Sequence, residues 1–423
     1  MLNNDYSKLL IIADDFTGAN DSGVQLTKKG AYVDVYFDWQ TDYSTSCSDV
    51  IVVNTDTRAL TPEDAKIRIT QLIKANSQPR PIYKKIDSTL RGNIGSEIET
   101  LLMLTEYQIA LIIPAFPDMN RTVINGICYV NNTELLQTEF ATDPKTPICS
   151  SSVKECLITQ TTCTVLEIGL QSIRAHTLVN QITQAANNGV KFFIIDAQTN
   201  EDLSLIMQQI RHLNFRSLLV GSAGLINYLP AHYLKNHVPY CLPDKDQHML
   251  VIAGSMSHVT QQQIAHAIEH NEQWQVIDLL LEDIFPHFNN DKISQYCQRI
   301  TDIFSKHKNA IIRTSKNTEE RHHITYYCQK YQLTRKELGE YICQCLGRIV
   351  QNINAKNLFL TGGDVAIAIA KSLGAIGFHI EGEVMSGIPY GCLLGKTQKN
   401  YRIFTKAGGF GEIDIFTRSL ELI

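Results

Sequence analysis

Two adjacent carboxylates, Asp14 and Asp15, follow the first apolar run of this chain of 423 residues. They stand between the strand-like residues 9–13 and a segment with helical spacing that ends at Gly30. Carboxylates accept hydrogen bonds from hydroxyl groups, and the end of a parallel strand is where α/β proteins bind ligands. The pair therefore predicts a ligand site that holds a hydroxyl group.

Three more segments of the first half pass from an apolar run into a polar cluster: residues 52–58, 83–93 and 113–121. A single Asp or Ser after a strand is often only a helix cap. Four such clusters are better explained by a shared site, because parallel strands end along one edge of a sheet. Arg58 and Lys85 supply cations suited to a carboxylate. A small polyhydroxy acid is the ligand class that uses both kinds of group.

The second half places glycine-rich turns after its apolar runs, at residues 254–258, 361–364 and 406–411. Glycine lets a backbone approach a ligand closely, and N–H groups at the start of a helix bind phosphate. These turns predict a nucleotide phosphate site in the second half.

Two standard nucleotide motifs do not fit. Residues 391–397 resemble a Walker A loop, but Gly391 is one residue too close to Gly395 for the loop to wrap phosphates. No Gly-x-Gly-x-x-Gly segment follows a predicted strand, which argues against a nicotinamide-dependent dehydrogenase.

The elements that must position these residues alternate between strand and helix patterns along the whole chain. Strands are expected at residues 9–13, 32–37, 50–54, 81–86, 109–114, 164–168, 190–196, 217–220, 249–254, 310–314, 357–360, 377–380 and 402–406. Prolines interrupt the pattern near residues 230–246. We therefore predict an α/β protein of two domains, residues 1–229 and 248–423, joined by a linker at 230–247. Each domain is expected to be a mainly parallel sheet flanked by helices, with the active site in the cleft between them.

Composition limits the choice of partners. The formal net charge is −5 and no long basic tract occurs, so nucleic acid is not an expected partner. No apolar run is long enough for a membrane span, and the first residues do not read as a signal peptide. The 11 cysteines include no Cys-x-x-Cys pair, which is typical of a reducing cytoplasm. Whether the chain forms a homo-oligomer cannot be read from the sequence.

Taken in order, the motifs resemble those of the four-carbon acid sugar kinases. They are residues 12–18, 85–92, 114–117, 254–255, 361–364 and 408–411. The resemblance spans almost the whole chain, and residues 19–26 are similar to the D-threonate kinase branch. It implies transfer of a phosphoryl group from ATP to the terminal hydroxyl of a four-carbon acid, with D-threonate favoured. D-erythronate, 3-oxo-tetronate and 4-hydroxythreonine are the alternative substrates.

The resemblance also implies the residues of the two sites. The substrate residues would be Asp14, Arg58, Lys85, Ile86, Asp87 and Ser88, and the ATP residues Ser255, Thr361, Gly362, Gly363, Asp364 and Gly408. Kinases place an acid near the accepting hydroxyl, and Mg²⁺ on the phosphates. Asp14 is the first candidate for the base, with Asp15 and Asp87 as alternatives.

Two points stay open. Asp15 has a second possible role as the cap of the following helix, and Asp364 is a candidate partner of Mg²⁺ without being assigned as a direct ligand. A non-catalytic sugar-acid sensor is the alternative from another class, and it would not need the glycine turns of the second half.

Overall fold

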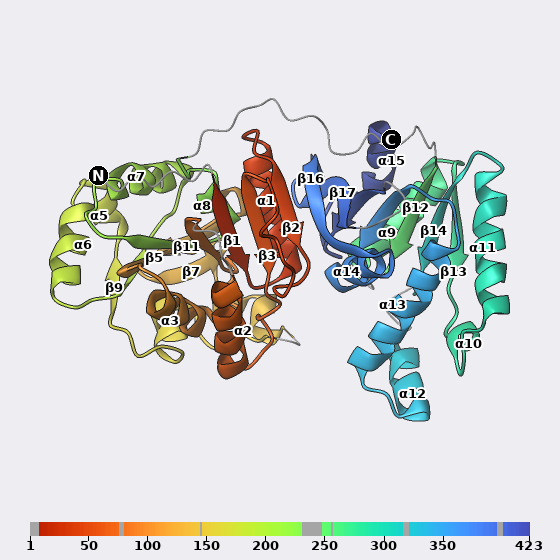
Figure 1. The fold of residues 1–423 in the computed structure, drawn as a ribbon, viewed down its shortest axis with the longest axis horizontal. Helices are drawn as coiled ribbons and strands as arrows, with labels where there is room; N and C mark the ends of the chain where they lie inside the picture. The colour runs from red at the N-terminus through yellow and green to blue at the C-terminus, as the bar shows by residue number, and fades with distance from the viewer. Residues whose placement is uncertain are drawn as a thin grey trace. The chain divides into compact units, whose positions relative to one another are not determined.

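The computed structural model of the protein describes residues 8–75, 80–143, 146–230, 248–254, 257–315, 321–395 and 401–423, with no side chains for 321–323. The chain divides into two compact units, Met1–His237 and Val238–Ile423. Both are built of strands and helices that alternate along the chain (Figure 1). The predicted linker falls almost wholly on residues 231–247, which lie outside the described residues.

The N-terminal unit contains a parallel sheet in the strand order β2-β3-β1-β4-β11-β5-β10-β9. Its strands are β1 (Leu9–Ala13), β2 (Val33–Tyr36), β3 (Val50–Asn54), β4 (Ile82–Lys85), β5 (Ile109–Ile113), β9 (Val165–Ile168), β10 (Phe192–Ile195) and β11 (Ser217–Gly221). Its α-helices are α1 (Phe16–Thr27), α2 (Pro62–Ala75), α3 (Ile94–Leu104), α4 (Val153–Ile158), α5 (Leu170–Arg174), α6 (Leu178–Asn187), α7 (Asn200–Ile210) and α8 (Ala223–Ile226).

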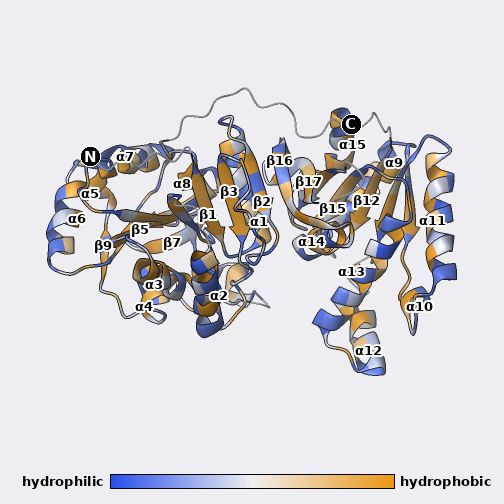
Figure 2. Cartoon of the chain, viewed as in Figure 1, coloured by the Kyte–Doolittle hydropathy of each residue, from blue (hydrophilic) through white to orange (hydrophobic). Residues whose placement is uncertain are grey.

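Strands β1 and β5 of this sheet are apolar along their whole length, because helices cover both faces of the sheet. Every residue of β1, β3 and β5 is buried. Figure 2 shows the apolar colour on the strands and polar residues on the outer faces of the helices. Strands of this kind read as continuous apolar runs rather than alternating ones, which is why the sequence predicted them well.

A small antiparallel sheet stands beside the main sheet of this unit. It consists of β6 (Arg121–Ile124), β7 (Ile127–Val130) and β8 (Thr133–Glu134). Short 3₁₀ helices flank it: η1 (Pro117–Met119), η2 (Leu135–Gln137) and η3 (Glu139–Thr142). These three strands are short and only partly buried, and the sequence pattern did not predict them.

The C-terminal unit contains strands in the order β13-β14-β12-β15-β18-β17-β16. The first five are parallel, and β17 is antiparallel to both of its neighbours. They are β12 (Met249–Ala253), β13 (Trp274–Asp278), β14 (Asn309–Arg313), β15 (Asn357–Thr361), β16 (Ala375–Met385), β17 (Ile388–Gly395) and β18 (Arg402–Lys406). The helices are α9 (His258–His270), α10 (Leu281–Ile284), α11 (Asn290–Phe304), α12 (Arg321–Tyr331), α13 (Arg335–Gln351), α14 (Gly363–Ser372), α15 (Ile415–Ser419) and the 3₁₀ helix η5 (Leu420–Leu422).

The predicted fold class, two α/β domains with mainly parallel sheets, is confirmed. Strand β17 explains the segment that resembled a Walker A loop: residues 391–395 pair with β16, and a Cβ atom at Gly391 would lie 1.9 Å from the His379 carbonyl oxygen. Lys396 and Thr397 lie outside the described residues. In the parts of the chain that the structure describes, no helix is long and apolar enough to cross a bilayer.

Candidate active site

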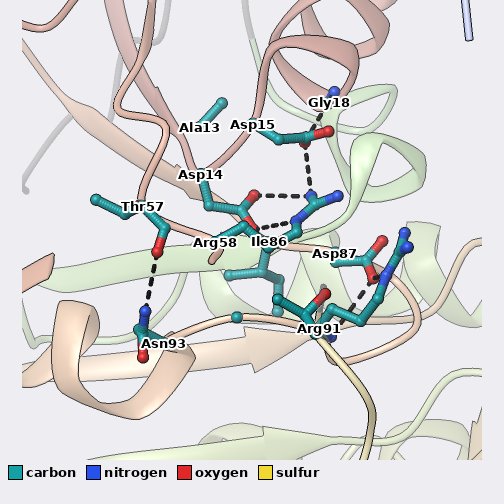
Figure 3. A network of polar contacts seen from close by, with 12 residues as sticks. Ala13, Asp14, Asp15, Gly18, Thr57, Arg58, Ile86, Asp87, Arg91 and Asn93 are labelled. Atoms are coloured by element: carbon teal, nitrogen blue, oxygen red, sulfur yellow. Dashed lines mark hydrogen bonds and ion pairs between the residues drawn. The ribbon is translucent and has the colours of Figure 1, made fainter. Parts of the chain in front are cut away.

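The acidic and basic side chains that were predicted to cluster in the N-terminal unit lie at the carboxyl ends of three neighbouring strands. Strand β1 lies between β3 and β4, with Ala13 in register with Asn54 and Lys85. The residues that follow these strands therefore meet at one edge of the sheet, as the sequence predicted. Figure 3 shows Asp14, Arg58 and Asp87 converging there.

The Arg58 guanidinium is the centre of this cluster. Its Nε and Nη2 donate to the two carboxylate oxygens of Asp14 at 2.7 and 3.1 Å, and Nη2 also donates to Asp15 Oδ1 at 2.6 Å. The Asp14 side chain is 5% exposed and that of Arg58 is 16% exposed. A fork of this geometry is stronger than a single neutral hydrogen bond and fixes both partners.

Backbone contacts hold the loop that carries Arg58. The N–H groups of Thr57 and Arg58 donate to the Asp14 carbonyl oxygen at 3.0 and 3.3 Å. The Asn93 amide donates to the Thr57 carbonyl oxygen at 2.9 Å (Figure 3) and to that of Leu60, also at 2.9 Å. These bonds keep the arginine in place before any ligand arrives.

Gly92 permits the close approach of its loop to this cluster. Its φ is +103°, and a Cβ atom would lie 3.2 Å from Asp14 Oδ2. A side chain there would be strained and would press on the carboxylate, so the motif needs glycine at this position.

Asp15 caps helix α1. Its Oδ1 accepts the Gly18 N–H at 3.0 Å, which satisfies one free donor of the first turn. Lys85 Nζ donates to the Ile86 carbonyl oxygen at 3.0 Å and lies 2.7 Å from where a Gly18 Cβ would stand. The Asp15 carboxylate and the Lys85 ammonium thus both lie close to Gly18.

Asp87 accepts hydrogen bonds from the side chains of two later residues of the same loop. Thr89 Oγ1 and Arg91 Nε donate to its Oδ2 at 2.5 and 2.6 Å. Arg91 also pairs with Asp143 through Nη1 at 2.9 Å. Arg91 is therefore shared between two carboxylates.

The pKa values of Asp14 and Asp87 are both lowered. Burial acts to raise the pKa of Asp14, but the charges of Arg58, Lys84 and Lys85 outweigh it. Burial likewise opposes the shift at Asp87, where Arg58 and Arg91 lower the pKa. Both carboxyl groups are therefore ionised at neutral pH and act as acceptors of hydrogen bonds.

The glycine turns of the C-terminal unit also meet at one edge of their sheet. Strand β15 lies between β12 and β18, with Thr361 in register with Ala253 and Lys406. The Gly362 N–H donates to the Lys406 carbonyl oxygen at 2.9 Å, which joins two of the turns. Ser255 lies outside the described residues.

Helix α14 begins at the second of these turns. Gly362 precedes the helix with φ +97°, and Gly363 and Asp364 form its first turn. Asp364 is exposed, and the buried Thr361 hydroxyl has no hydrogen-bond partner in the described part of the chain. The free N–H groups of a helix start are suited to an anion.

One carbonyl group orients the third turn. The Gly408 oxygen accepts from Ser257 Oγ at 2.5 Å, Thr260 Oγ1 at 2.9 Å and Lys406 Nζ at 3.0 Å. Because a trans peptide points its N–H away from its C=O, the Gly409 N–H faces the opposite direction. Among the described residues, and apart from its two chain neighbours, no atom lies within 4 Å of where a Gly409 Cβ would stand.

Two family models divide the chain as the two sites do. A model described as a sugar-binding N-terminal domain matches residues 9–229, and one described as a nucleotide-binding C-terminal domain matches residues 250–416. A D-threonate kinase of Salmonella typhimurium is 38% identical over 96% of this chain and 95% of its own length. The chain belongs to the four-carbon acid sugar kinase family.

The chain also resembles further proteins at lower sequence identity. A D-erythronate kinase of Heliobacterium modesticaldum is 29% identical, over 96% of this chain and 95% of its own. A solved Salmonella typhimurium structure shares the fold with a TM-score of 0.81 at 21% identity, covering 97% of this chain and 98% of its own. A Haemophilus influenzae structure does so with a TM-score of 0.78 at 22% identity, covering 98% and 99%.

Four residues of the two sites were not singled out from the sequence. Arg91, Asn93 and Arg121 stood inside the polar clusters already noted, so the signal was present but nothing ranked them above their neighbours. Lys406 ends β18, where it is only 3% exposed. Burial lowers the pKa of Lys406 to about 7, which the sequence does not indicate.

Proposed function

We propose that the protein transfers the γ-phosphoryl group of ATP to the terminal hydroxyl of a four-carbon sugar acid, with D-threonate as the favoured acid. The observation that carries the proposal is the pairing, in one chain, of a guanidinium–carboxylate cluster with glycine turns, one of which begins helix α14. The family relative named D-threonate kinase supports the choice of acid.

In the N-terminal unit we assign binding of the four-carbon acid to the following residues: Asp14, Arg58, Lys85, Ile86, Asp87 and Ser88. Asp14 would orient the terminal hydroxyl and accept its proton late in the transfer, and a low pKa is compatible with that timing. Arg58 already serves two carboxylates, so its main task would be to hold Asp14 in place. The prediction that Arg58 and Lys85 bind the substrate carboxylate stays a prediction.

In the C-terminal unit we assign binding of ATP to the following residues: Ser255, Thr361, Gly362, Gly363, Asp364 and Gly408. Backbone N–H groups would hold the phosphates, and Mg²⁺ would neutralise their charge. Mg²⁺ on a nucleotide needs only one or two protein carboxylates, and the exposed Asp364 fits that requirement. Direct transfer requires the terminal hydroxyl of the bound acid and the γ-phosphate of ATP to come together.

The test is a coupled ADP-release assay with D-threonate, D-erythronate, 3-oxo-tetronate and 4-hydroxythreonine. We expect the highest kcat/KM with D-threonate. A higher value with another acid would correct the substrate and leave the kinase assignment intact. Acid binding by calorimetry with no ADP release would favour the sensor.

Gly362→Val should raise the KM for ATP about 10-fold or more and leave the KM for the acid unchanged. A branched side chain at φ +97° costs about 1–3 kcal/mol, and the strain falls on the turn assigned to phosphate. Steady-state kinetics with each substrate varied in turn measures both constants. Gly374→Val is the matched control, since Gly374 (φ +82°) lies at the other end of α14 with open space around it. Equal ATP KM values for the two variants would contradict the assignment.

Nucleotide binding should take up a proton at about pH 8. Lys406 is largely neutral there because its pKa is about 7, and a phosphate nearby would raise that pKa again. We expect uptake of up to about one proton, falling toward zero below about pH 6, where the amine is already protonated. Calorimetry in two buffers of different ionisation enthalpy measures it. The uptake should vanish in Lys406→Met and persist in Lys371→Met, an exposed lysine of α14. Uptake that survives in Lys406→Met would assign the proton to another group.

A further inference from the structure

A substrate carboxylate needs a cation whose charge is not already neutralised by carboxylates of the protein. The two arginines of the central cluster (Asp14, Asp15, Arg58, Asp87 and Arg91) do not supply one. Arg58 pairs with Asp14 and Asp15. Arg91 pairs with Asp87 and Asp143. A guanidinium that neutralises two carboxylates attracts a third anion weakly.

Arg121 differs from both of these arginines. Its Nη1 donates to Ser88 Oγ at 2.6 Å, and its Nε is buried with no hydrogen-bond partner among the residues that the structure describes. Within the described ranges no carboxylate forms an ion pair with it. Leaving a charged donor buried and unbonded is costly unless a ligand completes it.

Arg121 lies beside the central cluster. Its guanidinium stands 5.7 Å from the centroid of the Phe140 ring, and that of Arg91 stands 5.2 Å from the same centroid. Ser88 follows Asp87 directly in the chain. Because the Ser88 hydroxyl accepts the bond from Arg121, its own proton is available to a ligand.

The strand that carries Arg121 is fixed at both ends. At its start, Arg121 and Phe116 exchange two backbone hydrogen bonds of 3.1 and 2.7 Å across η1. At its far end, the turn to β7 is held by Asp196, whose carboxylate accepts the N–H groups of Asn125 and Gly126 at 2.5 and 3.0 Å. The arginine is therefore presented from a rigid hairpin, which limits the entropy lost on binding.

We propose that Arg121, with Ser88 beside it, binds the carboxylate of the substrate and selects acids over neutral polyols. This inference rests on the proposed function and deepens it. It moves the carboxylate from Arg58 and Lys85 to the small antiparallel sheet, and leaves the terminal hydroxyl to Asp14.

The test compares D-threonate with D-threitol, which carries CH₂OH in place of the carboxylate. Arg121→Met should lower kcat/KM for D-threonate by about 10- to 100-fold, the range for a charge-assisted hydrogen bond, and change that for D-threitol little. If the role of Arg121 were purely structural, its replacement would lower kcat/KM for both substrates equally, and that result would overturn the inference. Arg216→Met is the matched control, because Arg216 precedes β11 at the opposite edge of the sheet.

A second variant decides the matter if D-threitol is turned over too slowly. Arg121→Lys keeps the charge but loses the fork, so it should bind D-threonate about 10-fold better than Arg121→Met in calorimetry. Equal affinities of the two variants would overturn the inference. Wild-type protein that binds D-threonate but releases no ADP would refute the proposed function alone, since binding still tests Arg121. Wild-type protein that binds no acid would overturn both.

Discussion

Replacing Asp14 by Asn should lower kcat with D-threonate by about 100- to 10,000-fold, the range for loss of a general base. The amide cannot take the proton of the attacking hydroxyl, and it can no longer accept the two-pronged hydrogen bond from Arg58. The Kd for ATP should not change, because the proposed nucleotide residues belong to the other unit. Steady-state kinetics together with calorimetry of ATP measures both.

Asp15→Asn is the control for this variant. Asp15 also contacts Arg58, but its carboxylate caps α1 and its side chain is 25% exposed. An asparagine caps nearly as well, so we expect kcat within about 10-fold of wild type. If Asp14→Asn keeps kcat within a few-fold while Asp87→Asn loses it, the base is Asp87.

The pH profile gives a second check on Asp14. Since its pKa is lowered, the carboxylate is ionised at every pH above its ordinary value and is protonated only below it. The rate should therefore show no acidic limb from this group between about pH 5 and pH 8. An acidic limb near pH 6 would point to a group with a raised pKa instead.

The sequence predicted the cluster at the carboxyl ends of β1, β3 and β4 to the extent that parallel strands determine it. Residues 9–13 and 50–54 are continuous apolar runs, and β1 and β3 have those bounds. Once these strands are neighbours, Asp14 and Arg58 must emerge at one edge. That step needs only the alternation of strands and helices, and not the positions of side chains.

The features that the sequence could not predict are those that depend on burial of charged side chains. Arg121 lies on β6, whose residues are mostly half-buried, so no apolar run in the sequence indicates this strand. The tight turn Asn125-Gly126, with φ values of +53° and +73°, was the one local signal for that hairpin. Lys406 resembles any lysine in the sequence, and only the packed structure shows that backbone oxygens surround its amine.

Lys84 and Lys85 illustrate the same limit in two adjacent residues. Successive side chains of a strand point to opposite faces, so the two lysines of β4 must differ in their surroundings. Lys85 reaches the start of α1, whereas Lys84 is fully buried against Glu97 of α3. The alternation of side chains along a strand requires the two lysines to have different surroundings, but it does not show which of them is buried.

Lys84→Met should lower the free energy of unfolding of the N-terminal unit by about 3–5 kcal/mol. Lys84 Nζ lies 2.5 Å from Glu97 Oε2, and the two side chains are 0% and 1% exposed. Methionine fills the space of the lysine stem but leaves the Glu97 charge buried without its partner. Urea unfolding followed by circular dichroism measures the loss. ATP affinity serves as the internal control, because its proposed site is in the other unit.

The double variant Lys84→Met with Glu97→Leu separates the cost of a lone charge from the value of the pair. Replacing a buried ion pair by apolar residues of similar size is often neutral, so the double variant should regain most of the loss. If it remains as unstable as Lys84→Met, the pair itself stabilises the fold. Because the Lys84 charge also helps to lower the pKa of Asp14, the double variant should be stable yet show an acidic limb shifted to higher pH. Stability regained without that shift would mean that Arg58 and Lys85 alone keep Asp14 ionised.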